Sequence, residues 1–110
     1  MSTRATVHFR YGGKTEAIVY RHSDGYPEGL GKALEEFLTE CEMLKDSRFD
    51  DPSYLAAKWV VADSARNPRG DHRLAFLGVG IVLEDPGDIE YRYLLECSTG
   101  RRPKVVVEAV

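Results

Sequence analysis

The sequence predicts an α+β domain in which two consecutive helices stand between a pair of strands and three further strands. Three observations carry this prediction: apolar and polar residues alternate near both ends, apolar residues recur at helical spacing in the middle, and turn residues separate these segments. The expected order is ββααβββ, with a mostly antiparallel five-stranded sheet and both helices packed on one face. A chain of 110 residues has the usual size of one domain, which we expect to span residues 1–110.

The composition excludes several classes of protein. Hydrophobic residues make up 43% and charged residues 30%, which is typical of a globular domain, and a net charge of -3 argues against bulk binding to nucleic acid or an anionic membrane. No apolar run approaches the roughly 18 residues of a membrane span, and the first ten residues lack the apolar core of a signal peptide. We therefore expect a cytoplasmic protein in which Cys41 and Cys97 are reduced and buried.

The first two strands are predicted to form a hairpin around Gly12-Gly13, because two glycines supply the positive φ angles of a two-residue turn. Residues 3–11 alternate between apolar and polar, and a two-residue turn pairs Tyr11 with Lys14. This register puts Ala5, Val7, Phe9, Ile18, Tyr20 and, beyond the strand end, His22 on a core face, and Arg4, His8, Arg10 and Arg21 on the opposite face.

Two helices are predicted next, the first from near Pro27 and the second after the N-cap residue Asp51, with Pro52 as its first helical residue. The second helix is expected to end near Asn67-Pro68, because proline disfavours helix in the residue before it. Spacing puts one set of side chains toward the core: Leu30, Leu34, Phe37, Leu38, Cys41 and Leu44 in the first helix, and Tyr54, Leu55, Trp59 and Val60 in the second.

Three strands are expected to close the chain. Residues 74–83 are almost continuously apolar, which is typical of a central strand, and residues 84–88 form a predicted hairpin loop to the next strand. If Leu83 pairs with Ile89 across this loop, Ile81 and Leu83 point inward. The last strand, 104–110, points Val105, Val107 and Ala109 inward. Because the helices cover one face only, an apolar patch stays exposed on the other, and we expect a face-to-face homodimer or higher oligomer through Leu74, Phe76, Val82 and Leu94.

The residues with the most chemistry lie between the second strand and the first helix, in the segment Y-R-H-S-D-G-Y-P-E-G-L-G at positions 20–31. A helix N-terminus has unpaired N–H groups and a partial positive charge, so it can hold an anion. The expected ligand contacts are Arg21, His22, Asp24, Tyr26 and Gly29. The alternative interpretation is structural: Asp24-Gly25 is ordinary turn chemistry, and Asp24 then simply caps the helix.

A second candidate is the basic loop 66–73, whose arginines Arg66, Arg69 and Arg73 suit phosphate recognition, or alternatively form a solvated loop. Signals for catalysis are weak, since H-E-x-x-H, G-x-S-x-G and S-x-x-K are all absent. We expect no catalytic residue, metal or cofactor. A small hydrolase using His22 and Asp24 as an acid–base pair is the least favoured reading.

The start MSTRA and the segment Y-R-H-S-D-G-Y-P resemble small phage- and prophage-encoded proteins of unknown function, in which Y-[KR]-H-x-D-G-Y-P precedes an amphipathic helix. The resemblance covers roughly the first forty residues and implies an intracellular bacterial or phage setting without an activity. We expect a small cytoplasmic phage- or prophage-type binding protein that sequesters an anionic or nucleotide-like ligand. The alternative is a protein-interaction module, such as an inhibitor of a host protein, acting through the acidic helix faces.

Overall fold

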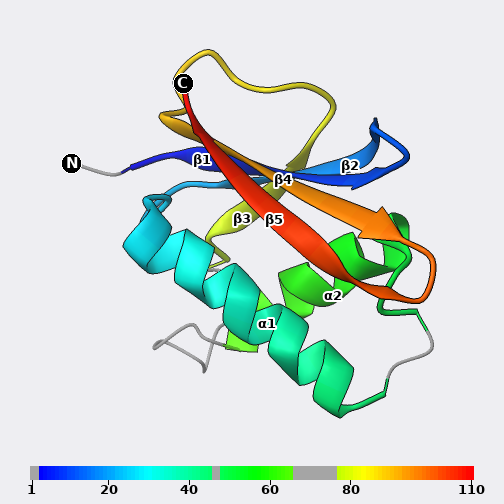
Figure 1. The fold of residues 1–110 in the computed structure, drawn as a ribbon. Helices are drawn as coiled ribbons and strands as arrows, with labels where there is room; N and C mark the ends of the chain where they lie inside the picture. Colours follow the sequence, from blue (N-terminus) through cyan, green and yellow to red (C-terminus); the bar gives the residue numbers. More distant parts are fainter. Residues whose placement is uncertain (1–2, 46–47, 66–76) are drawn as a thin grey trace.

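The computed structural model describes residues 3–45, 48–65 and 77–110, and it confirms the predicted α+β order (Figure 1). One five-stranded sheet has the strand order β3-β2-β1-β4-β5, and both helices lie on the same face of it (Figure 1). The β1–β4 pair is parallel and the other pairs are antiparallel. The elements are β1 (Ala5–Tyr11), β2 (Lys14–Arg21), the π-helical turn η1 (Pro27–Gly31), α1 (Lys32–Met43), α2 (Pro52–Ala65), β3 (Val79–Val82), β4 (Tyr91–Ser98) and β5 (Arg101–Ala109).

The β1–β2 hairpin has the predicted turn, but its predicted register is wrong beyond the first two residue pairs. Gly12 and Gly13 have φ angles of 60° and 79°, and Tyr11 pairs with Lys14 as expected. A bulge between Phe9 and Arg10 then shifts the pairing by one residue. Because side chains alternate along a strand, this shift turns every later residue of β2 to the other face. Val19 and Arg21 face the helices, Ile18 and Tyr20 lie on the opposite side, and His22 is exposed rather than on the core row.

The predicted central strand and its hairpin to β4 are also wrong. β3 is a short edge strand that pairs with β2, and the chain then crosses the sheet to place β4 beside β1 (Figure 1). The side chains of Ile81 and Leu83, expected inside, are 68% and 98% exposed. A continuous apolar run is typical of a strand covered on both faces, whereas here part of the run lies at an edge. Residues 74–76 of this run, and the expected helix end at 67–68, lie outside the described residues.

The core lies between the sheet and the two helices. Trp59 of α2 is fully buried and contacts the ring of Phe37 edge-on, with the ring centroids 5.4 Å apart. Asp51 caps α2 as predicted, because its Oδ1 accepts the Ser53 N–H at 3.1 Å. Two expected core positions are wrong: Leu44 lies beyond the end of α1 and is 72% exposed, and Tyr54 is 46% exposed.

The last hairpin, β4–β5, places the predicted residues of β5 on the helix side of the sheet. Val105 pairs with Leu95 and Val107 with Tyr93, and both β4 residues are buried. The other side of the sheet, which the helices leave uncovered, is called the open face here. Its side chains include those of Thr6, His8, Ile18, Tyr20, Arg92, Leu94, Val106 and Glu108.

Candidate functional site

A depression at the start of α1 brings together most of the residues predicted from the 20–31 segment. It has a volume of about 320 Å³, near the lower end of ligand-sized pockets. We call it the α1 depression; its lining residues are Arg21, Asp24, Tyr26, Glu28, Gly29, Lys32, Ala33 and Glu36. Of the five predicted contacts in this segment, His22 is absent from the lining. The predicted contacts Arg66, Arg69 and Arg73 lie outside the described residues.

The loop that forms the wall of the depression is tied to the sheet by backbone hydrogen bonds. The Gly25 N–H donates to the Thr3 carbonyl at 2.9 Å, and the Tyr93 hydroxyl donates to the Gly25 carbonyl at 2.7 Å. Burial raises the pKa of Tyr93 to about 12, so this hydroxyl keeps its proton at neutral pH. Asp24 has a left-handed φ of 56° and reverses the chain toward the helix. The wall is therefore a fixed part of the fold.

Two amides in the first turn of the helical segment donate to carbonyls of the same loop, whereas we expected amides at the helix start to be free to bind an anion. The Gly29 N–H donates to the Tyr26 carbonyl and the Leu30 N–H to the Asp24 carbonyl, both at 2.9 Å. A Cβ on Gly29 would lie 2.6 Å from the Asp24 carbonyl oxygen. Glycine is thus required here so that the chain can pack on itself, and the amides of Gly29 and Leu30 are not free to bind an anion.

Charge in the α1 depression is mixed rather than purely positive. Arg21 forms an ion pair with Asp63 of α2, with 2.8 Å between Nη1 and Oδ1, and both side chains are largely buried. The contact is electrostatic, because this buried Nη1 makes no hydrogen bond within the described part of the chain. Lys32 is exposed and adds a second cation, while the carboxylates of Asp24, Glu28 and Glu36 also line the site. The site therefore favours a ligand with several kinds of polar group over a simple anion.

Tyr26 supplies the aromatic surface of the site. Its side chain is 39% exposed at the rim of the depression, and its hydroxyl lies 3.5 Å from Oδ1 of Asp24. An exposed ring fixed beside cations and carboxylates can stack on a planar ligand group.

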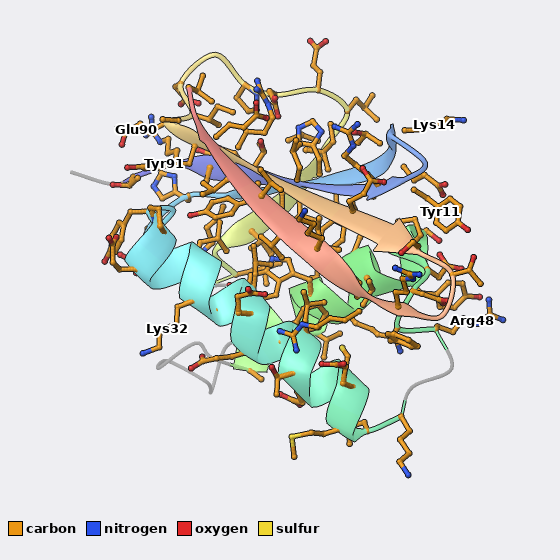
Figure 2. The ribbon with its side chains drawn as sticks, viewed as in Figure 1. Tyr11, Lys14, Lys32, Arg48, Glu90 and Tyr91 are labelled. Carbon is orange, nitrogen blue, oxygen red and sulfur yellow. The ribbon has the colours of Figure 1, made fainter. Side chains whose placement is uncertain are left out.

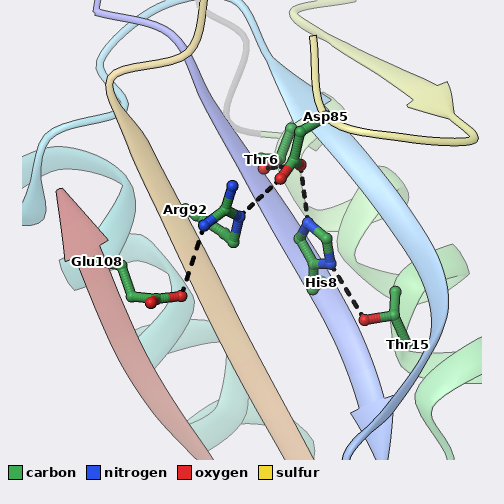
Figure 3. A network of polar contacts seen from close by, with 6 residues as sticks. All are labelled: Thr6, His8, Thr15, Asp85, Arg92 and Glu108. Carbon is green, nitrogen blue, oxygen red and sulfur yellow. Dashed lines mark hydrogen bonds and ion pairs between the residues drawn. The ribbon is translucent and has the colours of Figure 1, made fainter. Parts of the chain in front are cut away.

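A second polar cluster, which the sequence did not predict, lies on the open face (Figure 3). Asp85, from the segment between β3 and β4, accepts hydrogen bonds from Thr6 Oγ1 at 2.7 Å and Arg92 Nε at 2.6 Å. Its Oδ1 also lies 2.8 Å from Nε2 of His8, whose Nδ1 lies 3.1 Å from the Thr15 hydroxyl (Figure 3). These contacts hold the crossing segment 83–90 against β1 and β4. We call this group the Asp85 cluster.

In the Asp85 cluster the Thr15 hydroxyl contacts the His8 imidazole, which in turn contacts the Asp85 carboxylate. These are the residue types of a nucleophilic triad. Here the carboxylate also binds Thr6 and Arg92. Burial would raise the pKa of Asp85, but the hydrogen bonds from Thr6, His8 and Arg92 outweigh it and hold the pKa below its ordinary value of 3.8. Because the Asp85 carboxylate contacts three side chains of β1 and β4, it anchors the segment 83–90 to the sheet. We therefore assign the cluster a structural role.

The acidic face of α1, considered for protein interaction, is partly neutralised by Arg102 of β5. Its guanidinium donates to Thr39 at 3.0 Å and to the carboxylates of Glu35 and Glu42. Burial would lower the pKa of Arg102, but the hydrogen bonds to these carboxylates raise it above its ordinary value. The guanidinium therefore ties β5 to α1 and removes part of the negative charge that a partner would meet.

The remaining side chains add no metal centre in the described ranges, where no group of three or more His, Cys, Asp or Glu residues is placed to hold an ion. Cys41 and Cys97 are buried free thiols, and burial raises the pKa of Cys97 to about 12. None of the described helices is long and apolar enough to cross a membrane.

Fold and site together define a class: an α+β protein with a mixed five-stranded sheet, helices on one face, and a mixed-charge depression where β2 leads into α1. Comparisons with protein-family models, curated proteins and solved structures give no match to this chain.

Proposed function

We propose that this protein binds a small nucleotide-like ligand in the α1 depression and acts by binding rather than by catalysis. The observation that carries the proposal is the convergence of Arg21, Tyr26 and Lys32, two cations and a ring, around one ligand-sized depression. The proposal includes a cytoplasmic setting and a phage or prophage origin. The two buried free thiols and the resemblance of the first forty or so residues support that part.

Each lining group has a distinct part in this proposal. Lys32 and the guanidinium of Arg21 contact a phosphate, and the ring of Tyr26 stacks on a base. The carboxylates of Asp24 and Glu28 accept hydrogen bonds from sugar hydroxyls or amino groups. Because the same carboxylates repel a compact multivalent anion, the site discriminates against free inorganic phosphate.

Calorimetric titration against mononucleotides, cyclic nucleotides and inorganic phosphate tests this function. We expect at least one nucleotide to bind with a Kd below about 1 mM, and inorganic phosphate to bind less well. If no member of the panel binds below about 1 mM, the segment 20–31 is a structural turn, and the protein-interaction alternative takes first place.

Two variants locate the binding site. Tyr26→Ala and Lys32→Ala should each weaken nucleotide binding about tenfold, roughly 1.4 kcal/mol, because they remove the stacking ring and the exposed cation. Lys14→Ala is the matched control, since Lys14 is also exposed but lies on the other side of the molecule from Lys32 (Figure 2). Equal loss of affinity in Lys14→Ala and Lys32→Ala would mean nonspecific charge attraction. Arg21→Ala is less informative, because it also removes the ion pair with Asp63.

A further inference from the structure

The outer edge of β5 is long, with exposed valines in its second half. β5 covers nine residues, and in the part of the chain that the structure describes β4 is its only neighbouring strand. Val106, Val107 and Val110 along this edge are 44%, 41% and 64% exposed. The opposite edge strand, β3, has four residues. Edge strands of monomeric proteins are usually short, twisted away or covered, whereas a long open edge accepts a further strand.

The backbone of β5 directs alternate residues outward. The Val110 N–H donates to the Glu90 carbonyl at 2.9 Å and so points toward β4. Since the N–H and C=O groups of successive residues point to alternate sides of a strand, those of Val105, Val107 and Ala109 point away from β4. Pro103, which has no N–H, belongs to the same outward set, where an edge strand tolerates proline. The outer edge therefore presents both a donor and an acceptor at each of Val105, Val107 and Ala109.

Charges on β4 and β5 form rows that an identical strand would continue. Across the β4–β5 pair, Glu108 is opposite Arg92 and Lys104 is opposite Glu96. Nη1 of Arg92 lies 3.8 Å from Oε1 of Glu108. An antiparallel second copy, related by a two-fold axis at Val106, would place its own lysine beside Glu108 and its own glutamate beside Lys104. Each row across the two copies would then alternate in sign, which stabilises cross-strand pairs.

We propose that the protein forms a homodimer in which β5 pairs antiparallel with β5 of a second copy around a two-fold axis at Val106. Val105 then faces the partner's Val107, and both have outward N–H and C=O groups, as a hydrogen-bonded pair requires. Moving the axis to Val107 would place Lys104 opposite Val110 and lose both ion pairs. Moving it to Val105 would place Glu108 opposite Arg102, whose guanidinium already donates to carboxylates of α1. This contact is isologous and joins two sheets into one.

The edge pairing is distinct from the face-to-face association expected through Leu74, Phe76, Val82 and Leu94. Val82 and Leu94 are half-buried, and Leu74 and Phe76 lie outside the described residues. The segment 83–90 crosses part of the open face, where Asp85 is bound. The face-to-face contact stays a prediction, and the experiment below separates it from the edge contact.

Sedimentation and light scattering on charge-reversed variants test the edge pairing. We expect wild type to have twice the chain mass of 12.4 kDa. Lys104→Glu and Glu108→Lys each place like charges opposite one another at both ends of the pairing, so each should weaken the dimer about tenfold or more. An equimolar mixture of the two variants should dimerise again, because every cross-pair in the heterodimer is then of opposite sign. Native mass spectrometry distinguishes that heterodimer from either homodimer.

Two further variants serve as controls. Val107→Pro removes an outward N–H and leaves the β4 side unchanged, so it should dissociate the dimer while the chain still melts cooperatively. Lys14→Glu makes the same charge change away from β5 and should keep the wild-type mass. The proposal is overturned if wild type stays at 12.4 kDa up to about 100 µM, or if the mixed variants fail to form a heterodimer. It is also overturned if both charge variants remain dimeric, which would assign the contact to another surface.

Discussion

Replacing Trp59 with alanine is expected to lower the free energy of unfolding by about 3–5 kcal/mol, a large part of the roughly 5–15 kcal/mol that holds a domain folded. Trp59 has no exposed surface, and it packs edge-on against Phe37, which joins α2 to α1. Truncation to alanine leaves a cavity between two helices and a sheet, and these cannot all collapse into it. The loss should appear as a lower melting temperature and a lower urea midpoint with little change in the slope.

Val61→Ala is the matched control for this prediction. Val61 lies on the same helix, two residues further on, but its side chain is 70% exposed. Its truncation should change the free energy of unfolding by no more than about 0.5 kcal/mol. If Trp59→Ala melts within a degree or two of wild type, the packing of α2 described here is wrong.

The helices were predictable because their signals are local. Pro27 and Asp51 mark the two starts through backbone geometry and capping, which need no knowledge of the rest of the chain. The apolar spacing of Leu34, Phe37 and Leu38 then identified the buried side of α1. The same reasoning fails at Leu44, because the end of α1 has no strong stop signal.

Strand pairing was less predictable because register depends on contacts between distant segments. The β1–β2 bulge shifts pairing by one residue, and both Ile18 and Val19 are apolar, so either face of β2 gives a plausible core. The parallel neighbour of β1 is β4, about 80 residues further along the chain. A run of hydrophobic residues cannot distinguish that crossing from a hairpin.

In the candidate site, too, the contacts between sequence neighbours were predictable and the contacts between distant segments were not. Arg21, Asp24, Tyr26 and Gly29 were found because they are close together in the sequence, and a turn necessarily brings them near the helix start. The real partner of Arg21, Asp63, lies on the second helix, and no local pattern pairs them. Asp85 was interpreted as a turn residue, since Asp-Pro-Gly is ordinary turn chemistry.

The Asp85 cluster gives the second large prediction: Asp85→Ala should lower the free energy of unfolding by about 2–4 kcal/mol. The substitution leaves His8 and Arg92, which are largely buried and partly buried, without their shared carboxylate, and it releases the segment 83–90 from β1 and β4. Asp88→Ala is the control, because Asp88 lies in the same segment but forms an exposed ion pair with Arg4. Its cost should not exceed about 1 kcal/mol.

Acid titration should separate the electrostatic role of Asp85 from simple loss of packing. Because the pKa of Asp85 is lower in the folded protein than its ordinary value of 3.8, the carboxylate contributes its full stabilisation above that value. The contribution is lost as the pH falls through the folded-state pKa. The difference in stability between wild type and Asp85→Ala should therefore be full above about pH 5 and shrink as the pH falls below about 4, whereas Asp88→Ala retains Asp85 and should lose stability in acid as wild type does. A difference between wild type and Asp85→Ala that stays constant down to pH 2 would show that the segment 83–90 is held by packing and not by this carboxylate.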